Sequence, residues 1–113
     1  MGASILAGRD RMDLDNGMSL RLLSALEVLQ ARREAEELAQ SERERALCSN
    51  ACLLARALET QEGEPVFSSG REVLSGLRVE EIVALAGTWS RFNREENPGL
   101  TMEAEQAEDV KKN

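Results

Sequence analysis

Apolar and polar residues alternate on both sides of Asn16-Gly17, in the stretch RMDLDNGMSLRLL. Alternation around an Asn-Gly pair predicts a β-hairpin, here over residues 11–23. A two-residue loop would divide the apolar residues between two faces, whereas a three-residue loop, 15–17, puts them on one face. We therefore expect the three-residue loop, with Gly17 left-handed and the hairpin lying on a helix, because an isolated hairpin is marginal. The cross-strand pairs predicted in this register are Leu14 with Met18 and Met12 with Leu20.

Downstream, apolar residues recur with the period of a helix, and three serines mark where helices begin. Each serine precedes a periodic segment and is followed three positions later by glutamate, which is the spacing of a capping box. These serines are Ser24, Ser41 and Ser69. The predicted helices run over about 25–39, 42–59, 70–76 and 79–93. In the first helix, the apolar residues that lean to one side are Leu26, Val28, Leu29, Ala35 and Leu38.

The last predicted helix carries an apolar arc that covers about half of its circumference. Trp89 lies near the middle of this arc and is predicted to be a core residue, whereas Phe92 at its edge is the better candidate for a surface anchor. An arc of this width exceeds the stripe that one neighbouring helix needs, which leaves room for a partner. The residues of the arc are Val79, Ile82, Val83, Leu85, Ala86, Trp89 and Phe92.

The predicted fold is mainly α, of the α+β class, with a short N-terminal β-hairpin packed on a small bundle of three to four helices. One helical domain is expected over residues 11–98. Residues 1–10 are expected to form a flexible arm and residues 99–113 a flexible acidic tail. Between the second and third helices, TQEGEP breaks the chain, and Val66-Phe67 is expected to fold back on the core.

Charge and composition narrow the function by exclusion. The chain has 113 residues and a net charge of −7, which argues against binding to nucleic acid. No apolar run approaches the roughly 18 residues of a membrane span, and no secretory signal pattern opens the chain. A soluble protein of the cytoplasm, without a membrane partner, is expected.

Residue types that carry catalysis or hold metals are scarce. The chain contains no histidine, which removes the commonest general base and the commonest metal ligand. Cys48 and Cys52 stand four positions apart in a predicted helix, without the further ligands that a zinc site needs, and are expected to be buried free thiols. No phosphate-binding glycine motif occurs. We therefore expect no enzyme activity, no cofactor and no bound metal.

The order of three segments resembles the small tail assembly chaperones of tailed phages and prophages of Gram-positive bacteria. The resemblance covers roughly residues 18–98. Its segments are LRLLSALEVLQARREAEEL, RERALCSNACLLARALE and PVFSSGREVLSGLRVEEIVALAGTWSRFNREENP. In that family a longer form can arise by ribosomal frameshifting. This chain is hypothesised to be the short form, the alternative being an ordinary lysine-bearing tail.

The resemblance implies that the chain coats apolar helical segments of the tape measure protein, or another phage tail component, in the bacterial cytoplasm before the tail tube polymerises. It places Trp89 and Phe92 on the W-x-x-FN positions of the family, with Ile82 and Leu85 on the same arc. These four residues are the predicted partner-binding residues, although the resemblance leaves open whether they touch the partner or build the core.

Two other functions are also compatible with the sequence. A small structural or adaptor protein would use the same arc to form a homo-oligomer, without a role as a chaperone. A helix-turn-helix regulator is a third possibility. The start of its recognition helix would carry Glu80 and Glu81, which argues against DNA binding.

Overall fold

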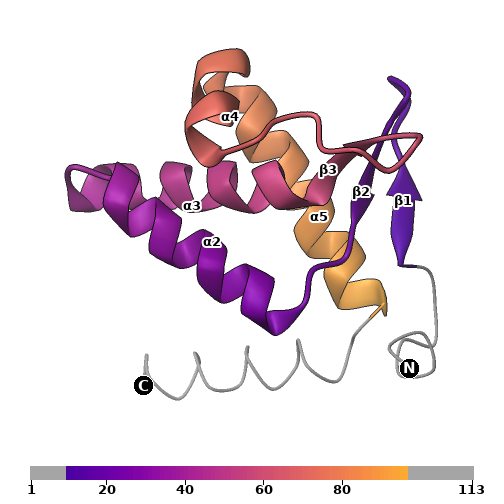
Figure 1. The fold of residues 1–113 in the computed structure, drawn as a ribbon, viewed down its shortest axis with the longest axis horizontal. Helices are drawn as coiled ribbons and strands as arrows, with labels where there is room; N and C mark the ends of the chain where they lie inside the picture. The colour runs from indigo at the N-terminus through magenta and orange to yellow at the C-terminus, as the bar shows by residue number, and fades with distance from the viewer. Residues whose placement is uncertain (1–9, 97–113) are drawn as a thin grey trace.

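The computed structural model describes residues 10–96, which form an antiparallel sheet of three strands and four helices (Figure 1). The strands are β1 (Arg11–Asp13), β2 (Met18–Arg21) and β3 (Leu58–Thr60). The helices are α2 (Ala25–Leu38), α3 (Glu42–Ala57), α4 (Gly70–Gly76) and α5 (Val79–Glu96). This architecture confirms the predicted fold class. The predicted tail and most of the predicted arm lie outside the described residues.

The hairpin has the predicted three-residue loop. Met12 pairs with Leu20, and the Leu14 amide donates to the Met18 carbonyl oxygen at 2.8 Å. Gly17 is left-handed, with φ of 84°, as the bulged turn requires. The hydrophobic alternation therefore selects the correct register.

Strand β3 is the element that the sequence pattern misses. The second helix was expected to continue to residue 59, but it ends at Ala57, and the next residues pair with β2, with Leu58 opposite Leu20 and Glu59 opposite Ser19. Leu58 is fully buried in this position. Helix propensity gives way here to a tertiary pairing that satisfies the second edge of β2 and buries an apolar side chain.

The three predicted caps have different outcomes. Ser24 forms the complete capping box with Glu27. The Ser69 hydroxyl accepts from the amide of Glu72 at 3.2 Å, so this serine also caps its helix. Ser41 makes no side-chain cap bond, and the Glu44 carboxylate instead accepts from the amide of the preceding residue, 40. Ser41 is thus the N-cap residue of α3, as predicted, but the predicted capping hydrogen bond of its side chain is absent.

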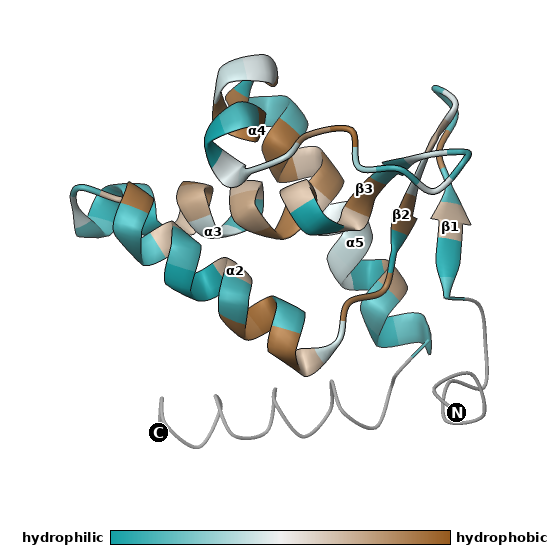
Figure 2. Cartoon of the chain, in the orientation of Figure 1, coloured by the Kyte–Doolittle hydropathy of each residue, from teal (hydrophilic) through white to brown (hydrophobic). Residues whose placement is uncertain are grey.

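The core forms where α3 meets the sheet, α4 and α5, and Figure 2 shows that apolar residues occur along α3 and β2. The main cluster consists of Leu20, Ala51, Leu54, Ala55, Ala57, Leu58, Val73, Ile82 and Trp89. Val66 and Phe67 pack against it, as predicted. A second cluster joins α2 to α3 through Ala31, Ala35, Cys48 and Cys52.

The inner face of helix α2 differs in part from the prediction. Its buried face consists of Ala31 and Ala35, so Leu26 and Leu29 remain exposed, at 59% and 45% of their full accessible area. Small residues let the axes of α2 and α3 approach closely, and the two helices make extensive contact along this seam. The predicted face is therefore correct for Ala35 and Leu38, which lie in or against the second cluster, and wrong for Leu26 and Leu29.

Candidate functional site

The four predicted partner-binding residues lie mostly inside the protein. Ile82 and Phe92 are each 1% exposed and Trp89 is 7% exposed, whereas Leu85 is half-buried and packs against the main core. The prediction that Trp89 belongs to the core is confirmed. Phe92 does not offer a surface anchor in this structure, because its side chain is enclosed. The buried side chains of Ile82, Trp89 and Phe92 therefore hold α5 in place.

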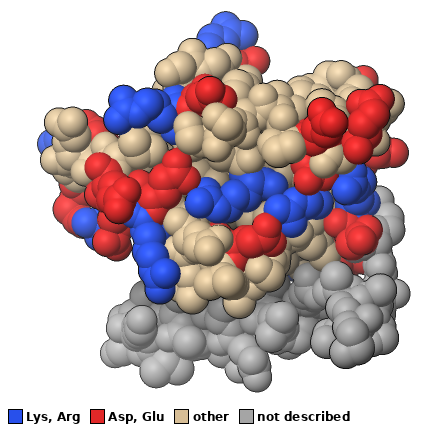
Figure 3. All heavy atoms as spheres, in the orientation of Figure 1, with Lys and Arg blue, Asp and Glu red and all other residues tan. Residues whose placement is uncertain are grey.

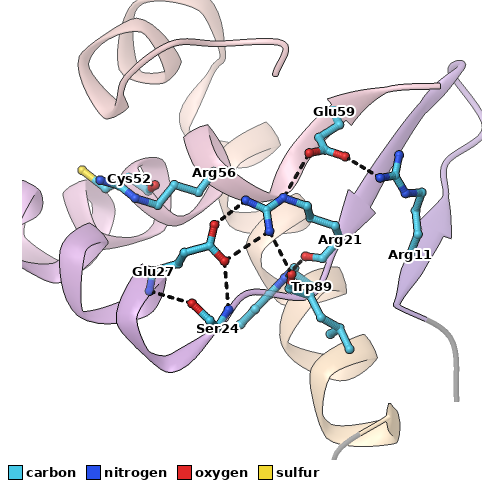
Figure 4. Close-up of polar contacts among 9 residues, drawn as sticks. Arg11, Arg21, Ser24, Glu27, Cys52, Arg56, Glu59 and Trp89 are labelled. Carbon is cyan, nitrogen blue, oxygen red and sulfur yellow. Dashed lines mark hydrogen bonds and ion pairs between the residues drawn. The ribbon is translucent and has the colours of Figure 1, made fainter. Parts of the chain in front are cut away.

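Trp89 also has a polar role in fixing α5 against the sheet. Its indole Nε1 donates to the carbonyl oxygen of Arg21 at 2.8 Å, so the ring is both buried and satisfied (Figure 4). Arg21 is the last residue of β2 and has no pairing partner in β3. The indole therefore donates to a backbone carbonyl oxygen that makes no hydrogen bond to β3.

The rest of the domain does not cover the whole apolar arc of α5. Val79 and Val83 stay 58% and 53% exposed, although both belong to the predicted arc. They lie four positions apart and share one row with Gly87, where an added Cβ would find no atom within 4 Å. This row, Val79–Val83–Gly87, is called the α5 row below. The sequence signal that could have pointed to this row is the isolated glycine inside a helical pattern, which costs helix stability.

An open groove of about 500 Å³ lies where α4 meets the connection between α2 and α3. Leu38, Leu47 and Leu74 supply its apolar lining, and the buried thiol of Cys48 borders it. Polar and charged residues also line it, namely Gln40, Glu44, Arg71 and Ser75. The groove has room for an apolar side chain from another molecule.

A network of ion pairs joins the hairpin, α2 and β3 through Arg21 (Figure 4). The guanidinium of Arg21 contacts Glu27 through both Nη atoms, at 3.2 and 2.5 Å, and contacts Glu59 through Nε at 3.0 Å. Glu59 also pairs with Arg11, at 3.0 Å. Glu59 is nearly buried, so the two arginines compensate a carboxylate that has little access to water.

The hydrogen bond from Arg21 lowers the pKa of Glu27 to about 2 from an ordinary value of 4.5, and the amide of Ser24 adds to this effect. Because the pKa is lower in the folded state, Glu27 stabilises the fold fully above about pH 4.5 and loses this effect as the pH falls toward 2. Glu27→Gln should therefore lower the free energy of unfolding by about 1–2 kcal/mol at neutral pH. The difference from wild type should vanish near pH 2. Urea unfolding at several pH values measures this.

The matched control for this experiment is Glu37→Gln, since Glu37 is exposed on the same helix. Its stability should follow that of the wild type throughout the acid range. Parallel losses of stability in wild type and Glu27→Gln below pH 4.5 would contradict the assignment.

A second polar cluster connects α2, α3 and α4. Glu34 accepts from Arg56 Nη1 at 2.7 Å and from the amide of Gly70 at 2.8 Å. Burial acts to raise the pKa of Glu34, but these hydrogen bonds outweigh it and the net pKa is lowered. Arg56 also donates to the carbonyl oxygen of Cys52 at 3.0 Å. The cluster thus fixes the start of α4 against the middle of α3.

Neither cysteine is poised as a nucleophile. Burial, followed by the negative charge of Glu34, raises the pKa of Cys52 to about 12, and burial also raises the pKa of Cys48. Both are buried free thiols, as predicted. A protonated and enclosed thiol reacts slowly with disulfide reagents.

Thiol titration tests this description. Wild-type protein should react slowly with a chromogenic disulfide at pH 8, and both cysteines should react at once in concentrated guanidinium chloride. Cys52→Ala should retain the slow native reaction of Cys48, which is 5% exposed and borders the groove. Rapid native modification of Cys52 would contradict the burial described here.

Within residues 10–96, no group of three or more cysteine and carboxylate side chains could hold a metal ion, and no helix is long and apolar enough to cross a membrane. Figure 3 shows acidic and basic side chains interspersed over the face that it displays. The fold and the surface together define a small α+β protein with apolar residues exposed on its helices. Comparison with protein-family models, with curated proteins and with solved structures finds no match.

Proposed function

We propose that this protein is a tail assembly chaperone that binds apolar helical segments of a phage tape measure protein before the tail tube polymerises. The proposal takes its class from the resemblance in the order and spacing of the sequence segments. The structural observation that carries it is the α5 row, whose valines remain exposed beside a buried arc. The binding surface is thus the outer border of the arc, and Ile82, Trp89 and Phe92 support it from inside.

A row of residues spaced by four on one helix is a surface on which a second helix can pack. Such a row forms a ridge that fits between the side chains of a neighbouring helix. Gly87 leaves open space over α5, so the backbone of a partner helix can approach closely there. The partner therefore has an apolar face. Glu80 and Glu81, exposed at the start of α5, favour a partner with basic residues beside that face.

Co-expression with the tape measure protein encoded nearby tests the proposal. Wild-type chaperone should keep the tape measure protein in the soluble fraction. Val83→Glu should reduce that soluble fraction several-fold, because a charge in the ridge must be desolvated against an apolar partner. Ala84→Glu is the matched control, since Ala84 is exposed on the same helix and points about 100° away from Val83.

Circular dichroism of the two purified variants should show wild-type helix content, since both positions are exposed. A tape measure protein that is equally insoluble with and without this chain would refute the chaperone function. Equal effects of Val83→Glu and Ala84→Glu would refute the α5 row as its binding surface.

A further inference from the structure

Within residues 10–96, strand β1 is the open edge of the sheet. The strand order is β1-β2-β3, and Figure 1 shows β1 as the outermost strand. The opposite edge is covered, because the amide of Val66 donates to Leu58 and the amide of Thr60 donates to the carbonyl oxygen of Glu64. No described segment covers β1 in this way. An uncovered edge strand presents backbone donors and acceptors to another strand.

The backbone groups that face outward belong to Arg11 and Asp13. Hydrogen bonds from Leu22 to Asp10 and from Leu14 to Met18 show which residues of this strand face β2. Because antiparallel pairing alternates, Met12 also faces β2, and the amide and carbonyl groups of Arg11 and Asp13 point away from the sheet. Their side chains carry opposite charges and both residues are exposed.

We propose that β1 pairs with β1 of a second copy of this chain, antiparallel and centred on Met12. A two-fold axis through Met12 places Arg11 opposite Asp13 of the second copy, and Asp13 opposite Arg11 of the second copy. Both cross-strand pairs join opposite charges. Both pairs also fall on residues whose backbone groups face outward, so each can exchange an amide–carbonyl bond in both directions.

The charges select this register over its neighbours. Moving the axis to Arg11 would place two arginines opposite each other, and moving it to Asp13 would place two aspartates opposite each other. Only the register centred on Met12 makes both central contacts attractive. The strand that pairs with β1 is therefore β1 of a second copy. When two Arg-Met-Asp segments run antiparallel, each arginine lies opposite an aspartate.

Existing contacts prepare Arg11 for this role. Its Nη2 atom contacts Glu59 at 3.0 Å, while 40% of its side chain remains accessible. A guanidinium has five N–H donors, so Arg11 can keep Glu59 and also meet an aspartate from the second copy. The strand is short and each chain carries a charge of −7, so the dimer should form only at high protein concentration.

Sedimentation of the full chain from micromolar to millimolar concentration tests the proposal. Wild type should show a reversible increase to dimer. Arg11→Asp and Asp13→Arg should each weaken self-association about tenfold or more, because each puts like charges opposite in both pairs. A mixture of the two variants should form a heterodimer. One β1 strand then carries acidic residues at positions 11 and 13, and the other carries basic residues at both.

Asp13→Arg leaves the contact between Arg11 and Glu59 in place, so comparison of this variant with wild type is decisive even if Arg11→Asp folds poorly. A monomeric wild type at millimolar concentration would overturn the proposal. Equal dimerisation of Asp13→Arg and wild type, or a mixture that stays monomeric, would also overturn it. The tape measure experiment concerns α5, so either proposal can fail without the other.

Discussion

Replacement of Gly70 by alanine is expected to lower the free energy of unfolding by about 2–4 kcal/mol. Gly70 opens α4 against the middle of α3, and a methyl group there would overlap the sulfur of Cys52 and lie 3.1 Å from its Cα. The backbone of α4 would have to move away. This movement would also lengthen the hydrogen bond from the Gly70 amide to Glu34, which now measures 2.8 Å.

Urea unfolding followed by tryptophan fluorescence measures this loss, because Trp89 is the only tryptophan in the chain and lies in the core. Gly87→Ala is the matched control. Gly87 is helical and an added Cβ there meets no atom within 4 Å, so this change should leave stability equal or raise it by up to about 1 kcal/mol.

A second substitution identifies the cause. Cys52→Ala, placed in the Gly70→Ala background, removes the overlapping sulfur and should restore part of the stability, while the contact with Cα persists. A Gly70→Ala protein that unfolds at the urea concentration of wild type would contradict the close approach of α3 and α4. So would a double variant that is no more stable than Gly70→Ala alone.

The sequence predicts the parts of this fold that depend on neighbouring residues. The hairpin register follows from alternation around one turn, and the cap at Ser24 follows from a glutamate three positions away. Strand β3 could not be predicted in the same way. Its partner β2 lies about forty positions earlier, and the local composition around Leu58 favours a continued helix.

The burial of the residues on α5 was predicted only in part. Periodicity correctly indicated that the arc of α5 is wider than its domain can cover, but it could not tell which border stays open. The ring of Trp89 turns inward because the carbonyl oxygen of Arg21 supplies a partner for its Nε1 atom. Val79 and Val83 are left outside, and only the packing of α5 on α3 and the sheet determines this outcome.

Long-range charge pairing is a further limit of sequence reasoning. The capping pattern identifies Glu27 as a helix cap, but nothing local connects Arg21 to Glu59, which lies thirty-eight positions later. In the structure, Arg21 joins both carboxylates and its backbone holds Trp89. The residue that organises the region around the site is therefore one that no motif in the sequence singles out.

Arg21→Met is consequently expected to lower the free energy of unfolding by about 2–3 kcal/mol at neutral pH, because Glu59 would stay nearly buried with Arg11 as its remaining ion-pair partner. The expected loss lies below that of a fully buried pair, since 27% of the Arg21 side chain is accessible to solvent. Urea unfolding measures it. Arg43→Met, at an exposed position on α3, is the control and should change stability by less than about 0.5 kcal/mol.

The pH dependence of the same variant distinguishes a lost ion pair from a packing defect. Without Arg21, the principal cause of the low pKa of Glu27 is gone, so the stability lost between pH 4.5 and 2 should be smaller than in wild type. Arg21→Lys retains a charge but cannot contact both carboxylates with a fork of donors, and its stability should lie between the two. If Arg21→Met lost stability equally at every pH, the proposed electrostatic role of Arg21 toward Glu27 would be wrong.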